Sequence, residues 1–292
     1  MVETPVGVVE LSGATLKTNL HTHTKFSDGK FPLAEVVSAY EDLGYDALAI
    51  TDHNRWEDHR QVSTDRLLVL SSNEPSLSHG EHALATGVQA PSPVDDGERH
   101  RERMQEVIDW TNEQGGLSTV NHPTWSGMSV ERLLELQRFD SIEICNAGCT
   151  GHGSEYSITH WDELLRRGRC VWGLATDDSH SDWDRGLGWV EVYSERTEEE
   201  IVDALEAGRF YASTGPRFEQ TSWDGERLFI KTEPVQGIAL MSDIGPVAVA
   251  HGGNDTVTEL EWRLGQRGCR YVRAELHRHD GKKAWGQPLF VG

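Results

Sequence analysis

The sequence is poor in cysteine, and it contains no long apolar run. Its four cysteines are irregularly spaced and form no CxxC pair, so we expect neither a zinc ribbon nor a thioredoxin-like site nor structural disulfides. No apolar stretch approaches the roughly 18 residues that span a bilayer, and the N-terminus lacks the basic and apolar segments of a signal peptide. These absences predict a cytoplasmic protein without a membrane partner.

Positive charge is also scarce, because 48 Asp and Glu stand against 27 Lys and Arg, for a formal net charge of -21. A field of this sign repels phosphate backbones and anionic lipid surfaces unless a local patch reverses it. The composition therefore argues against nucleic-acid binding. An anionic small-molecule substrate would need several metal charges to attract it. Only six of the basic residues are lysine, which fits either a high-salt cytoplasm or an arginine-rich coding bias.

Short apolar runs alternate with helical patterns over the first 216 residues. The runs predict buried strands at 47–51, 67–71, 83–88, 117–120, 141–145 and 171–176. Between them, Ser129 and Thr197 are candidate helix caps, and Gly44 and Gly208 mark helix ends. This alternation predicts βαβ units and a mainly parallel sheet, and the number of units favours a closed or distorted barrel over an open sheet.

The pattern changes after the segment Ser213-Thr214-Gly215-Pro216. Short alternating segments with Gly and Asp-Gly turns follow, and no helix is evident. We therefore predict an α/β barrel over residues 1–216 and a small β-rich appendage over residues 217–292.

Two histidines, His21 and His23, stand two residues apart in a strand-like context. Residues at this spacing in a strand point to the same face, so both imidazoles can reach one metal ion. Further potential ligands follow nearly every predicted strand: Asp28, Asp52, His53, Glu74, His122, Asp178 and His180. Because the carboxyl ends of barrel strands gather at one face, where active sites lie, this distribution predicts a metal site.

The ligand types favour a hydrolytic centre. Imidazole and carboxylate without thiolate are typical of Zn, Mn or Fe, whereas structural zinc usually recruits cysteine. The candidates are too numerous for one ion, so we expect two or three divalent ions that share a bridging carboxylate and activate water. No Ser-His-Asp or Cys-His arrangement is evident, and no catalytic group beyond metal-bound hydroxide is expected.

Seven motifs together identify a family resemblance over about residues 17–215. They are His21-x-His23, Ser27-Asp28-Gly29, Thr51-Asp52-His53-Asn54, Glu74, Asn121-His122-Pro123, Glu143-x-x-Asn146 and Asp178-x-His180. This set resembles the PHP (polymerase and histidinol phosphatase) family of metal-dependent hydrolases. Within that family the chain is most similar to the carbaryl-hydrolase branch, through segments such as 161–165, 175–180 and 208–216.

The resemblance implies a distorted TIM-like barrel of seven strands with a set of nine metal ligands. One ion would be held by His21, His23, Glu74 and Asp178. Glu74 would bridge to a second ion that is also held by His82 and His122, and a third would be held by Asp28, His53 and His180. His82 is preferred to its neighbour His79 because it directly precedes the strand at 83–88. Many relatives have His at the position of Asp28, which puts the strength of the third site in question.

Five residues beside the ligand motifs are candidates for supporting roles. Asp52 and Asp177 either orient a ligand histidine or cap the loop that follows. Lys25, Arg55 and Arg185 come just after ligand motifs, where they could hold an anionic group of the substrate.

The predicted reaction is hydrolysis of a small phosphate monoester or cyclic phosphodiester by a metal-bridged hydroxide. One alternative is hydrolysis of a carbamate, amide or carboxylic ester with the same metal cluster, as the resemblance to the carbaryl-hydrolase branch implies. Another is a non-catalytic metal-binding domain. A phosphoesterase should place at least two Arg or Lys near a metal-bound phosphate, whereas an acyl hydrolase should show an apolar, tryptophan-lined pocket.

Overall fold

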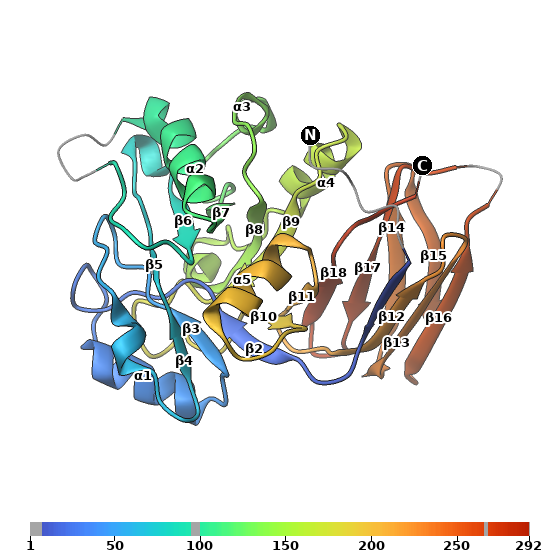
Figure 1. Cartoon of the computed structure of the whole chain (residues 1–292). Helices are drawn as coiled ribbons and strands as arrows, with labels where there is room; N and C mark the ends of the chain where they lie inside the picture. The colour runs from blue at the N-terminus through green and yellow to red at the C-terminus, as the bar shows by residue number, and fades with distance from the viewer. Residues whose placement is uncertain (1–7, 95–99, 266–267, 292) are drawn as a thin grey trace.

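The computed structural model describes residues 8–94, 100–265 and 268–291, and these form an α/β part and a C-terminal β part (Figure 1). The α-helices are α1 (Leu33–Asp42), α2 (Met104–Glu113), α3 (Val130–Glu135), α4 (Ile158–Arg166) and α5 (Glu198–Glu206), and the 3-10 helices are η1 (His59–Val62), η2 (Ser78–Gly80), η3 (Arg101–Arg103) and η4 (Ala147–His152). None of the helices in these described ranges is long and apolar enough to cross a membrane.

The strands of the α/β part confirm the runs expected from the sequence. They are β2 (Leu16–Asn19), β3 (Ala47–Ala49), β4 (Leu68–Leu70), β5 (Ser72–Asn73), β6 (Ala83–Thr86), β7 (Leu117–Val120), β8 (Ser141–Asn146), β9 (Trp172–Thr176), β10 (Trp189–Val192) and β11 (Phe210–Ser213). The side chain of Ser129 accepts a hydrogen bond from a backbone N–H at the start of α3, and that of Thr197 does so in α5, so both predicted caps are present.

The sheets of this part are mixed rather than mainly parallel, which corrects the sequence-based expectation. Four strand pairs are parallel (β2–β3, β3–β4, β7–β8 and β8–β9), and four are antiparallel (β5–β6, β6–β7, β2–β10 and β10–β11). These strands divide between two sheets. Strands β5 to β9 form one sheet, and β2, β3, β4, β10 and β11 belong to the other. The ladders of the described residues do not close into a ring, so the predicted TIM-like barrel is not confirmed.

The β part is joined to the α/β part by a shared sheet. Its strands are β1 (Val9–Ser12), β12 (Phe218–Trp223), β13 (Arg227–Val235), β14 (Gly237–Ser242), β15 (Gly245–His251), β16 (Val257–Arg263), β17 (Tyr271–His277), β18 (Lys283–Gly286) and β19 (Leu289–Phe290). Strand β18 pairs with β11, so one ten-stranded sheet runs from β15 to β4 through both parts. Near the N-terminus, β1 pairs with β12. The predicted boundary at residues 216 and 217 falls between β11, in the sheet that both parts share, and β12, in the four-stranded sheet of the β part.

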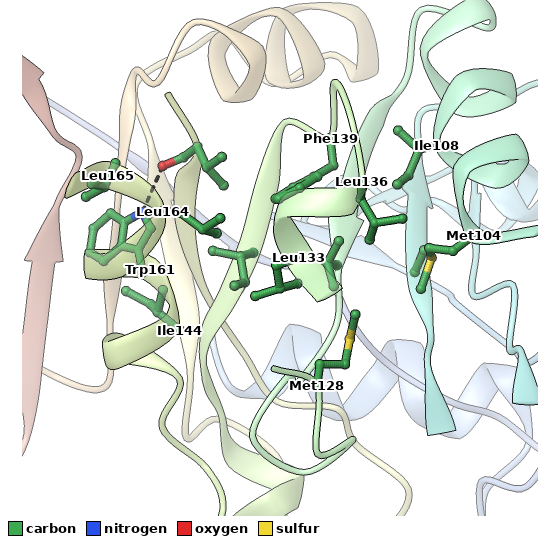
Figure 2. Close-up of a cluster of buried hydrophobic side chains, with 14 of the residues drawn as sticks. Met104, Ile108, Met128, Leu133, Leu136, Phe139, Ile144, Trp161, Leu164 and Leu165 are labelled. Atoms are coloured by element: carbon green, nitrogen blue, oxygen red, sulfur yellow. Dashed lines mark hydrogen bonds between the residues drawn. The ribbon is translucent and has the colours of Figure 1, made fainter. Parts of the chain in front are cut away.

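A large apolar core supports the sheet that carries β6 to β9. Figure 2 shows Met104 and Ile108 of α2, Leu133 of α3, and Trp161 with Leu165 of α4. The indole of Trp161 is fully buried and donates a hydrogen bond of 2.8 Å to the carbonyl of Val171, just before β9. Each such apolar side chain contributes about 1.5–3 kcal/mol when it is fully buried. This packing fixes the strands whose ends carry the polar cluster described below.

Candidate metal centre

The polar residues predicted from strand ends converge at one edge of the α/β part. An isolated parallel bridge joins Thr22, between the two histidines that follow β2, to Ser179, between Asp178 and His180 after β9. A second parallel bridge joins His53 to Glu74. These bridges extend the strand pairing just far enough to place ligands from distant parts of the chain side by side.

Glu74 lies at the centre of the cluster and is completely buried. Its Oε2 lies 3.3 Å from Nε2 of His21 and 3.3 Å from Nε2 of His23, and 2.8 Å from Nδ1 of His53. Its Oε1 lies 3.0 Å from Nδ1 of His82 and 3.7 Å from Nε2 of His122. One carboxylate therefore contacts five imidazoles, as a bridging ligand would.

Two further carboxylates complete the cluster. Oδ1 of Asp178 lies 3.2 Å from Nε2 of His21 and 3.1 Å from Nε2 of His23. Asp28 reaches Nε2 of His180 at 3.4 Å and Nε2 of His53 at 3.5 Å. All nine residues that the sequence suggested as ligands thus lie in one continuous cluster. His79, the neighbour of His82, is exposed and contacts Ser78 instead.

Buried ligand atoms without hydrogen-bond partners indicate that the cluster is suited to metal. Nε2 of His21, Nε2 of His23 and Oε2 of Glu74 are buried and have no hydrogen-bond partner, since Nδ1 of His53, although 2.8 Å from Oε2, bonds to the hydroxyl of Ser76. Buried polar atoms are almost always satisfied, so three orphaned ligand atoms that face one another indicate a missing partner. Three groups of side chains have ligand atoms within 4.8 Å of one another: His21, His23 and Glu74; His53, Glu74 and His82; and His23, Asp28, His53 and His180.

The electrostatics of the metal-free cluster couple imidazoles to carboxylates. Burial disfavours the charged form of His53, but Glu74 and Asp28 outweigh it and raise the pKa of this imidazole to about 10. Burial likewise opposes the charge on His180, yet Asp28 and Asp178 raise its pKa to about 9. Burial would raise the pKa of the Glu74 carboxyl, but the surrounding histidines lower it well below its ordinary value. Protonated His53 and His180 therefore offset part of the negative charge of Glu74, Asp28 and Asp178.

Glu143 is a functional residue to which the sequence reasoning gave no role. It is completely buried on β8, and its Oε1 lies 2.7 Å from Nδ1 of His21. Its Oε2 accepts hydrogen bonds from the backbone N–H of His122 at 2.8 Å and from the side chain of Asn146 at 2.9 Å. The available signal was an acidic residue inside the buried apolar strand Ser141–Asn146. This carboxylate orients ligands rather than binding metal itself.

The two acidic candidates for supporting roles hold loops. Asp52 accepts hydrogen bonds from the backbone N–H groups of Thr24 and Ser27 and from both hydroxyls, which fixes the turn before Asp28. Asp177 accepts three backbone N–H groups from residues 186–188 at 2.8–2.9 Å and the hydroxyl of Tyr40 at 3.0 Å. Burial raises the pKa of the Asp177 carboxyl to about 6 despite these bonds. Asp177 thus holds a loop that follows it, whereas Asp52 holds the earlier turn at residues 24–27.

A cavity of about 290 Å³ opens over the cluster. Its lining comprises Asp28, His53, Glu74, His82, His122, Trp125, Gly148, Cys149, His152, Asp178, His180, Trp183 and Asp184. The three basic candidates lie outside this lining: Lys25 and Arg55 are exposed, and the guanidinium of Arg185 lies over the ring of Phe31 at 4.5 Å. The described wall of the cavity therefore carries carboxylates, imidazoles and two tryptophans.

Comparison with known proteins supports the family resemblance over part of the chain. Residues 19–112 match the PHP domain family. The whole chain is similar in fold to a two-domain protein from Bacteroides vulgatus that contains a predicted PHP-like metal-dependent phosphoesterase, with a TM-score of 0.55, 19% identity, and coverage of 98% of this chain and 97% of that one. No curated protein matches the sequence.

Two weaker structural similarities cover less of the chain. An amidohydrolase from Chromobacterium violaceum gives a TM-score of 0.44 and 14% identity over 56% of this chain and 87% of that one. A lesion-specific endonuclease from Pyrococcus furiosus gives 0.46 and 13% over 66% of this chain and 56% of that one. The resemblance to the carbaryl-hydrolase branch stays a prediction.

Proposed function

We propose that the chain is a metal-dependent hydrolase of small phosphate monoesters or cyclic phosphodiesters. The observation that carries this proposal is the convergence of three buried ligand atoms without partners, on His21, His23 and Glu74. Imidazole and carboxylate oxygen together suit Zn, Mn or Fe. The PHP domain match over residues 19–112 supports the same function.

Two or three divalent ions would occupy the cluster. His21, His23, Glu74 and Asp178 would hold one ion, and Glu74 would bridge to a second on His82 and His122. Asp28, His53 and His180 would hold a third. Bound ions would supply an activated water and would neutralise charge on the reacting phosphoryl or acyl group.

The chain's own side chains prepare this site by fixing the ligands. Asn121 donates a hydrogen bond of 2.7 Å to Oε1 of Glu74, and Asn146 donates one of 3.1 Å to Oδ2 of Asp178. With Glu143 behind His21, the ligand carboxylates and imidazoles are oriented before any substrate arrives. The cavity of about 290 Å³ limits the substrate to a small molecule.

Attraction of an anionic substrate would depend on the ions. The cluster includes three ligand carboxylates, and Glu143 adds a fourth beside His21, so two divalent ions would neutralise the site and a third would make it positive. The net charge of -21 on the whole chain makes this local excess of positive charge the feature that favours a phosphate.

The second candidate function is hydrolysis of a carbamate, amide or carboxylic ester. It is favoured by Trp125 and Trp183, which line the cavity with exposed fractions of 42% and 55%. It is also favoured by the positions of Lys25, Arg55 and Arg185 outside the lining. A neutral substrate with an apolar group would pack against the indoles and would require no basic side chain.

A metal analysis and a substrate panel test the proposal. The purified protein is analysed for Mn, Zn and Fe, alongside His21→Ala and the exposed control His279→Ala. The panel contains p-nitrophenyl phosphate, bis(p-nitrophenyl) phosphate, p-nitrophenyl acetate and a naphthyl carbamate, each assayed with Mn²⁺ or Zn²⁺ and with orthophosphate as inhibitor. Circular dichroism of each variant verifies that it is folded.

We expect His21→Ala to lose metal, whereas wild type and His279→Ala should retain it. We also expect the wild type to hydrolyse the phosphoesters and orthophosphate to inhibit this hydrolysis. Unchanged metal content in folded His21→Ala would contradict the site. Much faster hydrolysis of the acetate or carbamate would replace the phosphoester proposal by the acyl one. A metal-loaded protein that hydrolyses none of the four substrates would support a non-catalytic domain.

A further inference from the structure

The 3-10 helix η4 is held against the metal-ligand segment and ends in a histidine that faces the cavity. It follows β8 directly, and the side chain of Asn146 accepts the N–H of Cys149 at 3.2 Å. The N–H of Gly148 donates to the carbonyl of Asp177 at 2.8 Å. A Cβ at Gly148 would lie 2.6 Å from the carbonyl oxygen of Asp178, so only glycine permits this approach. The last residue of η4, His152, is thereby fixed in the wall of the cavity.

Most titratable side chains in the described cavity wall already have another role. Asp28, His53, Glu74, His82, His122, Asp178 and His180 belong to the ligand cluster, which leaves Cys149, His152 and Asp184. Oxygens of Asp184 accept hydrogen bonds from the backbone N–H groups of His180 at 3.0 Å and Ser181 at 2.9 Å. Burial raises the pKa of the Cys149 thiol well above its ordinary value, which makes it a weak proton donor near neutral pH.

His152 differs from both. Its side chain is exposed at the cavity wall, so solvent has direct access to the imidazole. The charged groups that share the cavity with it from other elements include the carboxylates of Asp28, Asp178 and Asp184.

The geometry points to His152 as the proton donor to the leaving group, a role that rests on the proposed hydrolase function. As the bond between phosphorus and the ester oxygen breaks, its electron pair passes to that oxygen, which takes a proton from the imidazolium. Water supplies the new oxygen on phosphorus and releases a proton to solvent. The neutral imidazole then takes up a proton from solvent, so the cycle is balanced.

The ring of Trp183 lies beside η4 at the same wall. A Cβ at Gly151 would be 4.0 Å from the Trp183 ring, and this indole is 55% exposed. Trp183 and His152 therefore share one wall of the cavity, and a leaving group that lay against the indole would be near the end of η4.

The test compares two esters that differ in their need for a proton. Phenyl phosphate releases a basic phenolate, which needs a proton as it leaves, whereas p-nitrophenolate is a stable anion. Metal-loaded wild type, His152→Gln and the exposed control His279→Gln are assayed on both. For His152→Gln we expect kcat to fall about 100-fold or more on phenyl phosphate, the usual size of general acid catalysis, and less than about threefold on p-nitrophenyl phosphate. Added imidazole should restore phenyl phosphate hydrolysis by His152→Ala.

The possible results separate this inference from the proposed function. Equal losses on both esters, or no loss on either, would overturn the role of His152 while leaving the hydrolase in place. If the wild type is inactive on phosphate esters but active on p-nitrophenyl acetate, the same variants are compared on phenyl acetate and p-nitrophenyl acetate. The loss in kcat of His152→Gln should again be large on the phenyl ester and small on the p-nitrophenyl ester. A metal-loaded wild type that is inactive on all four esters would overturn the proposed function and this inference together.

Discussion

Nδ1 of His21 lies 2.7 Å from Oε1 of Glu143, and both side chains are completely inaccessible to solvent. A carboxylate in this position accepts the Nδ1–H and fixes the tautomer whose Nε2 is free to bind metal. The same carboxylate accepts the hydroxyl of Thr176 at 2.7 Å and the backbone N–H of His122 at 2.8 Å. One buried side chain thus links the segments that follow β2 and β7 to the last residue of β9.

Glu143→Gln should weaken metal binding without removing a ligand. The four donors around Glu143 require both of its oxygens, and an amide NH₂ would face donors on one side. We expect a loss of about 10–100-fold in metal affinity, as for other groups that orient metal ligands. Titration of the metal-free protein with Zn²⁺ against a competing chelator measures it. The exposed Glu131→Gln on α3 should match wild type, and an affinity of Glu143→Gln equal to that control would contradict the assigned role.

Gly148→Ala should disturb the site through a steric clash. The new Cβ would lie 2.6 Å from the carbonyl oxygen of Asp178 and 3.2 Å from its Cβ, so either η4 or this ligand must move. A shift of about 1 Å at a catalytic site can reduce the rate about 100-fold, and we expect a loss of that order in kcat. Gly151→Ala is the matched control on the same 3-10 helix, because its Cβ meets only the Trp183 ring at 4.0 Å. Equal kcat in the two variants would contradict the prediction, because it would mean that the backbone relieves the clash without moving the ligand.

The strand-end argument found most of the cluster because those ligands follow the strands that carry them. His82 is different, since it precedes β6, and β6 runs antiparallel to β7. The start of β6 therefore lies beside the end of β7, and His82 meets His122, with ring centroids 5.0 Å apart. Reasoning from parallel strands could not place it, and only the family resemblance did.

Two other features depend on pairings between distant segments, which local sequence patterns do not encode. From the sequence, Glu143 could face either the ligand cluster or the apolar core. Its contact with His21, 122 residues away, shows that it faces the cluster. The pairing of β11 with β18 likewise joins residues 211–213 to residues 284–286. The alternating tail was visible in the sequence, but its fusion with the α/β sheet was not.

His59 should make stability depend on pH. This residue of η1 is 6% exposed, and burial lowers the pKa of its imidazole below the ordinary value although Asp52 opposes the shift. In the unfolded chain it takes up a proton near pH 6.5, whereas in the folded chain it resists protonation. The unfolded state therefore binds more protons as the pH falls through 6.5, and the folded state loses stability.

Urea unfolding of the metal-free protein at pH 8 and pH 5.5 measures this effect. His53 and His180, whose pKa values are raised, oppose this effect in every variant, so the prediction concerns the difference between the proteins. The unfolding free energy at pH 5.5, relative to that at pH 8, should be higher in His59→Gln than in wild type, and His279→Gln, at an exposed position, should match wild type. The same change in all three proteins would contradict the prediction.

Asp162→Asn should destabilise the protein through the guanidinium of Arg273 on β17. That side chain is completely buried, donates to Oδ1 of Asp162 on α4 at 2.9 Å and to Oδ2 at 3.0 Å, and lies 4.7 Å from the Trp161 ring. The variant leaves a buried cation with only Glu275 nearby, at 3.4 Å. Breaking a buried pair in this way costs about 3–5 kcal/mol, and we expect the lower end because Glu275 remains.

The exposed pair of Arg138 and Asp109, at 2.7 Å with side chains 63% and 38% exposed, provides the matched control. Asp109→Asn should change the unfolding free energy by less than about 1 kcal/mol, as for other surface pairs. Urea unfolding followed by both tryptophan fluorescence and metal release compares the two variants. Because Arg273 joins the β part to α4, and the ten-stranded sheet runs through both parts, Asp162→Asn should shift both signals together. A shift in fluorescence alone would mean that the β part unfolds independently of the metal centre.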